Sequence, residues 1–320
     1  MARYQPAGPS GWPSHRTVAL AGYLIFGKSD FRNIANKRRE WKEMSAQKYP
    51  GLRTAIEHNA PYWAGECAVA FKYFSGGART PEKDICWIEL QMFKEWTGSG
   101  VYGDRSVTVT GVIQKGLDLL RTIEGGGAVK DLDEVSHLIQ FGLDEFEHFK
   151  ILYKLYRRIA PDRNVSIFDM GNLPEARKMV EMRQSFRETK PLGDTIVDLT
   201  EGGGLGMYFG IVKAFATVGV ASEEDRIIRE FANMTVRDET EHMRHRIQKA
   251  MALDVSSQQW ADVDRGLQTL FAQKLTERNE QFGNVFSQAE LDAMAKDVEA
   301  GKAYTRTNLG FLDSQVALAA

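Results

Sequence analysis

The sequence has little of what several classes of protein require. Cys67 and Cys86 are the two cysteines among 320 residues, too few for a disulfide framework and typical of a reducing compartment. The apolar stretch Thr17–Phe26 is too short to span a bilayer and lacks a basic leader with a cleavage site. The net charge of −2 offers no general attraction for nucleic acid or for a membrane surface. We therefore expect a cytoplasmic protein that binds neither.

Strand signals are also scarce. After residue 30, apolar residues recur at helical spacing almost without interruption, which predicts helices. The expected helices cover residues 31–48, 52–75, 82–97, 105–124, 131–159, 173–188, 192–218, 223–251, 257–281 and 287–300. The first 30 residues contain several prolines and predict an irregular arm. No charge run or linker divides the rest, so we predict one all-α domain over residues 31–320.

Two of the expected helices carry the same polar cluster inside an apolar stretch. The segments LDEFEH and RDETEH both contain Asp-Glu-x-Glu-His. On a helical wheel, Glu145 and His148 share the apolar face of the first helix, and Glu239 and His242 share that of the second. In each motif the first glutamate therefore points inward and the second outward. A buried ionised carboxylate is strongly unfavourable unless it is paired or binds a metal.

The repetition of the motif matters because a single Glu-x-x-His pair is weak evidence. Composition alone predicts fewer than one such pair, and the sequence has three. The third pair, Glu134 and His137, lies on the same helix as Glu145 but about 16 Å before it at 1.5 Å per residue. We interpret Glu134 as a capping residue of the first turn. For the other two pairs, the alternative to a metal site is a buried ion-pair network.

A shared metal site explains both motifs together. Two facing Glu-x-x-His helices, with one further glutamate from each of two other helices, form the ligand set of carboxylate-bridged di-metal bundles. Metal-bound histidines usually donate their other ring N–H to a carboxylate or carbonyl. Asp144 and Asp238 directly precede the inward glutamates, so we expect each to reach the histidine of the facing helix. The ligands that these two motifs predict are Glu145, His148, Glu239 and His242.

Hairpin geometry indicates a third carboxylate. A turn near Val220 lies 19 residues before Glu239, and 19 residues before Val220 stands Glu201. Glu201 shares a helical face with apolar residues and is therefore expected to point inward. The glycines that follow it, from Gly202 to Gly206, are poor helix formers. We interpret them as space for a ligand or for dioxygen.

The fourth carboxylate is predicted less directly. Glu124 continues an apolar stripe and belongs to the helix before the first motif. If the residues after it extend along the next helix for about 20 Å, Glu124 lies level with Glu145. Glu66 and Glu89 are alternatives, because each lies in a strongly apolar helix and the two helices are expected to face each other. We predict Glu124 as the ligand and keep both alternatives open.

These residues resemble a known group of proteins. The chain is similar to the ferritin-like di-iron carboxylate superfamily over about residues 50–250, and closest in layout to its oxygenase and ribonucleotide-reductase small-subunit branch. The segment RDETEH also resembles the corresponding stretch of the p-aminobenzoate N-oxygenase type. That type has an additional histidine four residues before the glutamate, where this sequence has Thr235, so a seventh ligand is not implied. The interval from Glu124 to Glu145 is shorter than is usual in the superfamily.

The resemblance implies a ferritin-like four-helix bundle with additional surrounding helices. It also implies two iron ions, or manganese, and an enzyme that uses dioxygen to hydroxylate or N-oxygenate a small organic substrate. Such an enzyme needs an external electron donor, a reductase or a ferredoxin, and a homodimer fits this group. The alternatives are a radical-generating di-metal subunit, a ferroxidase, a manganese catalase and a metal-free helical scaffold. A radical-generating role requires a tyrosine beside the cluster, and Tyr153 is turned away on the helical wheel.

Overall fold

The structure is helical throughout its described part. This computed structural model describes residues 48–77, 79–97, 109–128, 132–170, 172–189, 192–200 and 203–294, and none of these residues forms a strand. The predicted all-α class is therefore confirmed. The expected arm over residues 1–30, and the expected helix over residues 31–48 except Lys48, lie outside the described residues. The other described residues belong to one compact unit, Tyr49–Leu312, and the predicted domain bounds stay a prediction.

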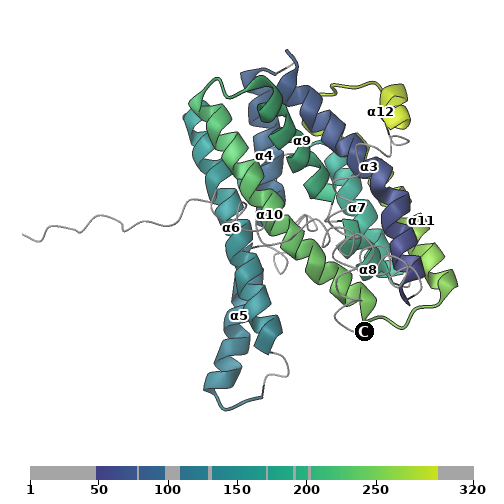
Figure 1. Cartoon of the computed structure of the whole chain (residues 1–320). Coiled ribbons are helices and arrows are strands. Elements are labelled where there is room, and N and C mark those ends of the chain that lie inside the picture. Colours follow the sequence, from purple (N-terminus) through teal and green to yellow (C-terminus); the bar gives the residue numbers. More distant parts are fainter. Residues whose placement is uncertain are drawn as a thin grey trace, which may run out of the picture. The chain divides into compact units, whose positions relative to one another are not determined.

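The helices of this unit follow the predicted ranges closely. In chain order they are α3 (Pro50–Ser75), α4 (Pro81–Thr97), α5 (Val109–Glu124), α6 (Leu132–Ile159), α7 (Pro174–Thr189), α8 (Gly193–Thr200), α9 (Gly203–Val218), α10 (Glu223–Met251), α11 (Ser257–Gln281) and α12 (Gln288–Met294) (Figure 1). A single 3-10 turn, η2 (Ile167–Asp169), precedes α7. The one difference in number is that α8 and α9 stand where the periodicity predicts a single helix over residues 192–218.

Local capping explains where the long helices begin. At the start of α10 the backbone N–H of Asp225 donates to the hydroxyl of Ser222 at 3.1 Å. At the start of α11, Ser256 and Gln259 form a reciprocal capping box. Both arrangements satisfy amide groups that have no partner within the helix. Pro81 opens α4, in the first turn, where a proline displaces no helical hydrogen bond.

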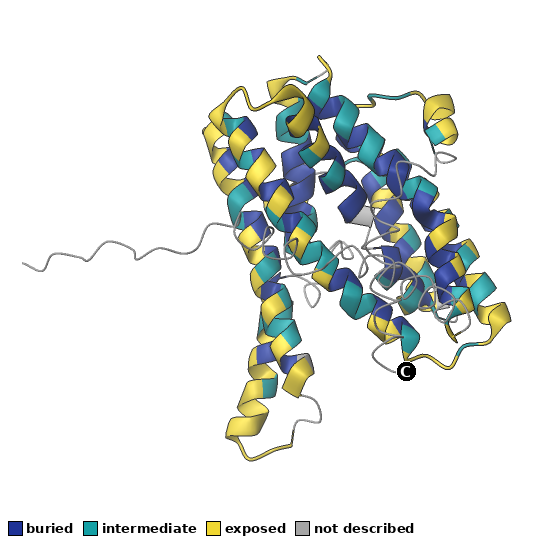
Figure 2. Cartoon of the chain, in the orientation of Figure 1, coloured by how far each residue is buried: buried dark blue, intermediate teal, exposed yellow. Residues whose placement is uncertain are grey.

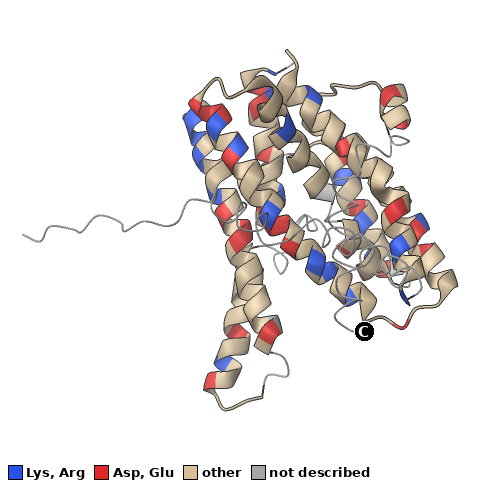
Figure 3. Cartoon of the chain, in the orientation of Figure 1, with Lys and Arg blue, Asp and Glu red and all other residues tan. Residues whose placement is uncertain are grey.

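Four helices, α4, α6, α9 and α10, pack around one another, and the other described helices surround them. Helix α4 lies against α6, α6 against α10, and α10 against α9 (Figure 1). Helix α3 also packs on α9, and α11 packs on α3, α7 and α8. Basic and acidic residues are interspersed along α10 (Figure 3). The described part of the unit is thus a helical bundle with surrounding helices, as predicted.

Burial follows this arrangement. Figure 2 shows the buried residues gathered between the packed helices, whereas the far end of the α5–α6 hairpin is exposed. Trp87, Tyr208 and Phe231 are among the largest side chains that are fully buried. Among the described residues, no helix is both long enough and apolar enough to cross a membrane.

Glycine in α9 serves helix packing. A Cβ atom at Gly206 would lie 2.5 Å from the carbonyl oxygen of Trp63 in α3, and one at Gly210 would lie 2.3 Å from that of Cys67. The backbones of α3 and α9 therefore approach to a distance that only glycine permits. This corrects the interpretation of Gly206 as space for a ligand, because α3 occupies that space.

Candidate metal centre

The two Glu-x-x-His motifs point as the helical wheel predicts. Glu145 and His148 are buried on α6, and His242 is buried on α10 beside the partly buried Glu239. The second glutamates of the two motifs, Glu147 and Glu241, are exposed. Since α6 and α10 pack against each other, their inward side chains face a common interior.

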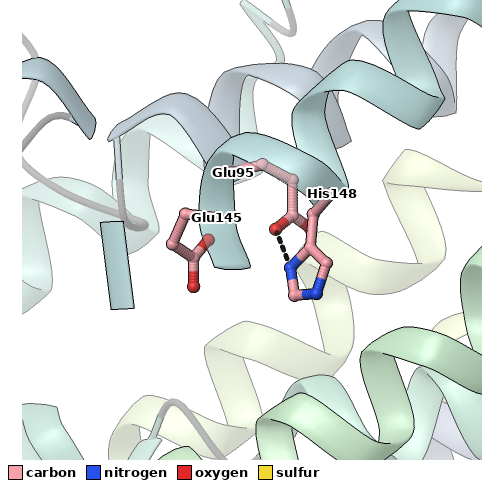
Figure 4. Close-up of side chains that lie close together, drawn as sticks. All are labelled: Glu95, Glu145 and His148. Carbon is pink, nitrogen blue, oxygen red and sulfur yellow. Dashed lines mark hydrogen bonds and ion pairs between the residues drawn. The ribbon is translucent and has the colours of Figure 1, made fainter. Parts of the chain in front are cut away.

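A carboxylate from α4 completes the first half of this interior. Glu95 is 3% exposed, and its Oε2 atom lies 3.1 Å from Nδ1 of His148. Figure 4 shows Glu95 and His148 turned toward each other, with Glu145 beside them on the same side. The possible ligand atoms of Glu95, Glu145 and His148 lie within 4.8 Å of one another, and so do those of Glu145, Glu239 and His242. Glu145 belongs to both groups, the position of a carboxylate that bridges two cations.

An aspartate of the opposite helix faces each histidine. Asp238 on α10 lies 3.2 Å from Nε2 of His148 on α6, and Asp144 on α6 lies 3.5 Å from Nε2 of His242 on α10. The crossed contacts expected from the sequence are therefore present. In both histidines Nε2 faces an aspartate and Nδ1 faces glutamates, which lie 3.8 Å from His242 Nδ1. A proton held on Nε2 by the aspartate leaves the lone pair of Nδ1 for a metal.

The charges in this interior are poorly balanced without a cation. Burial raises the pKa of Glu145 well above its usual value, and the neighbouring Glu95 and Glu239 raise it further. Burial opposes the charged form of His148, but its contacts with Asp238 and Glu95 raise its pKa well above the ordinary value. Glu95, Glu145 and Glu239 each form an ion pair with a histidine of the two motifs.

The residues present therefore fit metal ions. Carboxylate oxygens and imidazole nitrogens together are the donors that iron, manganese and similar divalent metals accept. A cation between the glutamates would offset their mutual repulsion, which otherwise forces protons onto the cluster. The chain thus has Glu/His groups that could hold metal ions, and the donor set does not specify which metal.

The position of Glu124 corrects the prediction made for it. Glu124 is exposed at the end of α5. The helices α5 and α6 form an antiparallel pair in which Gly116 meets Ile139 and Gly142 meets Ile113, so Glu124 lies near the start of α6. Glu145 is 13 residues further along α6, about 20 Å away.

The turn between these helices explains the difference. The prediction required an extended segment that climbs along α6. Instead, the amide N–H groups of Gly125 and Gly127 donate back to Arg121 and Thr122, and Gly126 adopts a positive φ of 78°. This glycine turn closes the helix locally, and Glu124 stays at the tip of the hairpin.

The two alternative carboxylates have other partners. Glu66 lies 3.2 Å from the guanidinium of Arg278 on α11. Glu89 accepts a hydrogen bond from Tyr156 at 2.8 Å and pairs with Arg163. Neither belongs to the two Glu/His groups. Glu201 lies outside the described residues, so its role stays a prediction.

Glu95 is the functional candidate that the sequence argument missed. It follows Ile88 and Met92 at helical spacing and therefore continues the apolar face of α4. Glu89 lies within the apolar stretch CWIELQMF, whereas Glu95 lies beyond its end on the same helix. The periodicity was sufficient to propose Glu95, but not to choose it over Glu89.

The histidine of the third Glu-x-x-His pair, His137, does not belong to the centre. The ring of His137 stacks on that of His245 with 3.8 Å between centroids, and neither residue belongs to the two Glu/His groups.

Comparison with protein-family models, with curated proteins and with solved structures finds no match for this chain. The geometry of the site itself is therefore the basis for a functional proposal.

Proposed function

We propose that this protein is a ferritin-like di-iron oxidoreductase that uses dioxygen to hydroxylate or N-oxygenate a small organic substrate. One observation supports the proposal most. The two Glu/His groups share Glu145, and each histidine turns Nδ1 toward the glutamates and Nε2 toward an aspartate of the opposite helix. A bundle needs this crossed arrangement to hold two cations side by side, whereas an ion-pair network has no such requirement.

The residues of this chain would divide the work. Iron, when bound, supplies redox chemistry with dioxygen. Glu95, Glu145 and His148 would hold one cation, and Glu145, Glu239 and His242 would hold the other. Asp238 would keep a proton on Nε2 of His148, Asp144 faces Nε2 of His242, and the burial of the groups limits access of water.

The decisive experiment is metal loading without oxygen. We expect the chelator-treated protein to bind about two ferrous ions per chain and then to consume dioxygen in the presence of an electron donor. Aromatic amines, aromatic rings and alkyl chains form the substrate panel. A protein that binds no metal under these conditions is the metal-free scaffold, and the proposal is then wrong. Peroxide dismutation with manganese, or iron oxidation without any substrate, would identify the catalase or ferroxidase alternatives.

A second function is favoured by one residue. Tyr208 is fully buried, and its hydroxyl donates a hydrogen bond of 2.8 Å to Glu95. A radical-generating subunit requires a tyrosine in such a position, and the sequence shows Tyr153 turned away from the cluster. Tyr153 is 45% exposed. After the ferrous protein reacts with dioxygen, electron paramagnetic resonance distinguishes the two functions, because a stable tyrosyl signal that is lost in Tyr208→Phe would support the radical role.

A further inference from the structure

Buried donors converge on one oxygen of Glu95. The hydroxyl of Tyr208 donates to Oε1 at 2.8 Å, and the side-chain amide of Gln91 donates to the same atom at 2.6 Å. The other oxygen, Oε2, faces Nδ1 of His148. A carboxylate oxygen that already accepts two hydrogen bonds is a poor metal ligand, so Glu95 has one oxygen left for a cation.

The amide of Gln91 is oriented by a second glutamine. Gln281 on α11 donates from its side-chain amide to the carbonyl oxygen of Gln91 at 3.1 Å. The carbonyl of Gln281 in turn accepts from the guanidinium of Arg278. A guanidinium can only donate, so it requires the oxygen of Gln281 on its side. The amide nitrogen of Gln281 must then face Gln91, and the amide nitrogen of Gln91 must face Glu95.

The start of this chain of hydrogen bonds is an ion pair. Arg278 is 2% exposed and Glu66 is 0% exposed, and Glu66 is the counter-charge that keeps the guanidinium in place. Gln91 and Gln281 are buried as well. Buried hydrogen bonds in such a chain reinforce one another. The chain therefore carries a fixed orientation from α11 to Glu95.

Among the described residues, the ligands of the other half are held more loosely. Glu239 and Glu145 each lie 3.8 Å from Nδ1 of His242, and Asp144 lies 3.5 Å from its Nε2. These distances exceed those of good hydrogen bonds. The side chain of Glu239 is also more exposed than that of Glu95, 15% against 3%. A cation at this half must first order its ligands, which lowers the affinity.

We propose that the chain from Glu66 through Arg278, Gln281 and Gln91, together with Tyr208, holds Glu95 as a single-oxygen ligand, so that the His148 half binds a divalent cation before the His242 half. The inference rests on the proposed function only in requiring that both Glu/His groups bind metal. The members of the chain act through Glu95 and are positioning residues.

The order of filling is tested by titration with Co²⁺. The full-length, chelator-treated protein is titrated without oxygen, and binding is followed by calorimetry and by the visible absorption of bound cobalt. We expect two resolved steps. His242→Ala should keep the tight step and lose the weak one, whereas His148→Ala should lose the tight step. If His148→Ala keeps the tight step, the assigned order is wrong.

The role of Tyr208 has a matched control. We expect Tyr208→Phe to weaken the tight step about 10-fold, the lower end of the range for groups that orient metal ligands, and to leave the weak step unchanged. Tyr156→Phe also removes a buried hydroxyl that donates to a glutamate at 2.8 Å, but that glutamate is Glu89, outside both Glu/His groups. This control should bind Co²⁺ as the unaltered protein does.

The chain itself is tested one step further from the metal. Gln281→Met removes the amide that orients Gln91, and we expect it also to weaken the tight step. Gln273→Met is the control, since Gln273 is a buried glutamine of the same helix whose amide donates to Glu175 instead. Far-ultraviolet circular dichroism checks that each variant is folded before titration.

The outcomes separate the two proposals. Absence of cobalt binding by the unaltered protein would overturn the proposed function. Two cobalt ions bound with equal affinity, or a Tyr208→Phe variant that binds Co²⁺ as the unaltered protein does, would overturn the proposed order of filling. Neither result would contradict the proposed metal centre.

Discussion

Two buried glutamates with opposite roles allow a sharp comparison. Glu66 pairs with Arg278 at 3.2 Å, and both are almost completely buried. Glu145 lies between two further glutamates, and its pKa is raised first by burial and then by their charge. The perturbation is the same in both places, a change of Glu to Gln that keeps the shape and removes the charge.

The change at Glu66 should destabilise the metal-free protein. Glu66→Gln leaves the guanidinium of Arg278 buried without its counter-charge. Breaking a buried pair in this way costs about 3–5 kcal/mol. The amide oxygen can still accept a hydrogen bond, so we expect about 3 kcal/mol. For a large domain this corresponds to a fall in Tm of roughly 6–12 °C.

The change at Glu145 should not destabilise the metal-free protein. A raised carboxyl pKa means that the folded state disfavours ionisation, so stability is lost as the pH rises above the unfolded value of about 4.3. Glu145→Gln removes this loss, and we expect a free energy of unfolding at pH 7 equal to or above that of the unaltered protein. The stabilisation by metal, about 2.7 kcal/mol at 100 times Kd, should disappear.

The assay is urea and thermal unfolding of chelator-treated protein, with and without Co²⁺, followed by circular dichroism. Equal destabilisation of the metal-free protein by Glu145→Gln and Glu66→Gln would refute the reasoning. Glu145 would then hold the fold through ion pairs, which is the metal-free alternative.

Three further predictions follow from the geometry. Asp238→Asn should lower metal affinity about 10–100-fold, because Nε2 of His148 loses its carboxylate partner. Competition with a chromogenic chelator measures the affinity, and an unchanged affinity would contradict the prediction. Burial disfavours the protonated form of both histidines, but nearby carboxylates outweigh it. Asp238 and Glu95 raise the pKa of His148 well above its ordinary value, and Asp144 and Glu239 raise the pKa of His242 to about 10. Metal must displace these protons, so metal affinity should rise with pH and binding should release protons. Calorimetry in buffers of different ionisation enthalpy measures the protons released. Metal binding that does not depend on pH would contradict this prediction. Gly206→Ala should destabilise the protein by about 1–3 kcal/mol, since the new Cβ would lie 2.5 Å from the carbonyl oxygen of Trp63; an unchanged Tm contradicts the close packing of α3 and α9.

Local patterns in the sequence were enough for a large share of this structure. Helical periodicity placed most helix ends within a few residues, because burial of one apolar face is a property of each segment. The same periodicity separated inward Glu145 from outward Glu147. It also led to the crossed contacts of Asp144 and Asp238, since a residue next to an inward ligand on one helix reaches the facing helix.

The identity of the remaining carboxylate depended on long-range packing. Glu66, Glu89 and Glu95 all lie on apolar helices, and periodicity alone cannot rank them. Glu66 accepts a hydrogen bond from the guanidinium of Arg278, which lies 212 residues later in the chain. Glu95 faces His148 because α4 packs along α6. Glu124 was misplaced because a glycine turn, rather than an extended segment, sets the register of α5 against α6.

The sequence therefore indicated the buried face of most helices, since the period of a helix is local chemistry, but the apolar stripe of α5 that leads to Glu124 is exposed. Which buried charges meet was decided in the tertiary structure, because the rotation and translation of one helix against another depend on contacts between distant segments. The two Glu-x-x-His motifs could be recognised from the sequence because each lies within a single helix, where the spacing places Glu and His on the same face. Periodicity places Glu95 on the apolar face of α4, but the chain of donors that holds it depends on the packing of α4, α9 and α11.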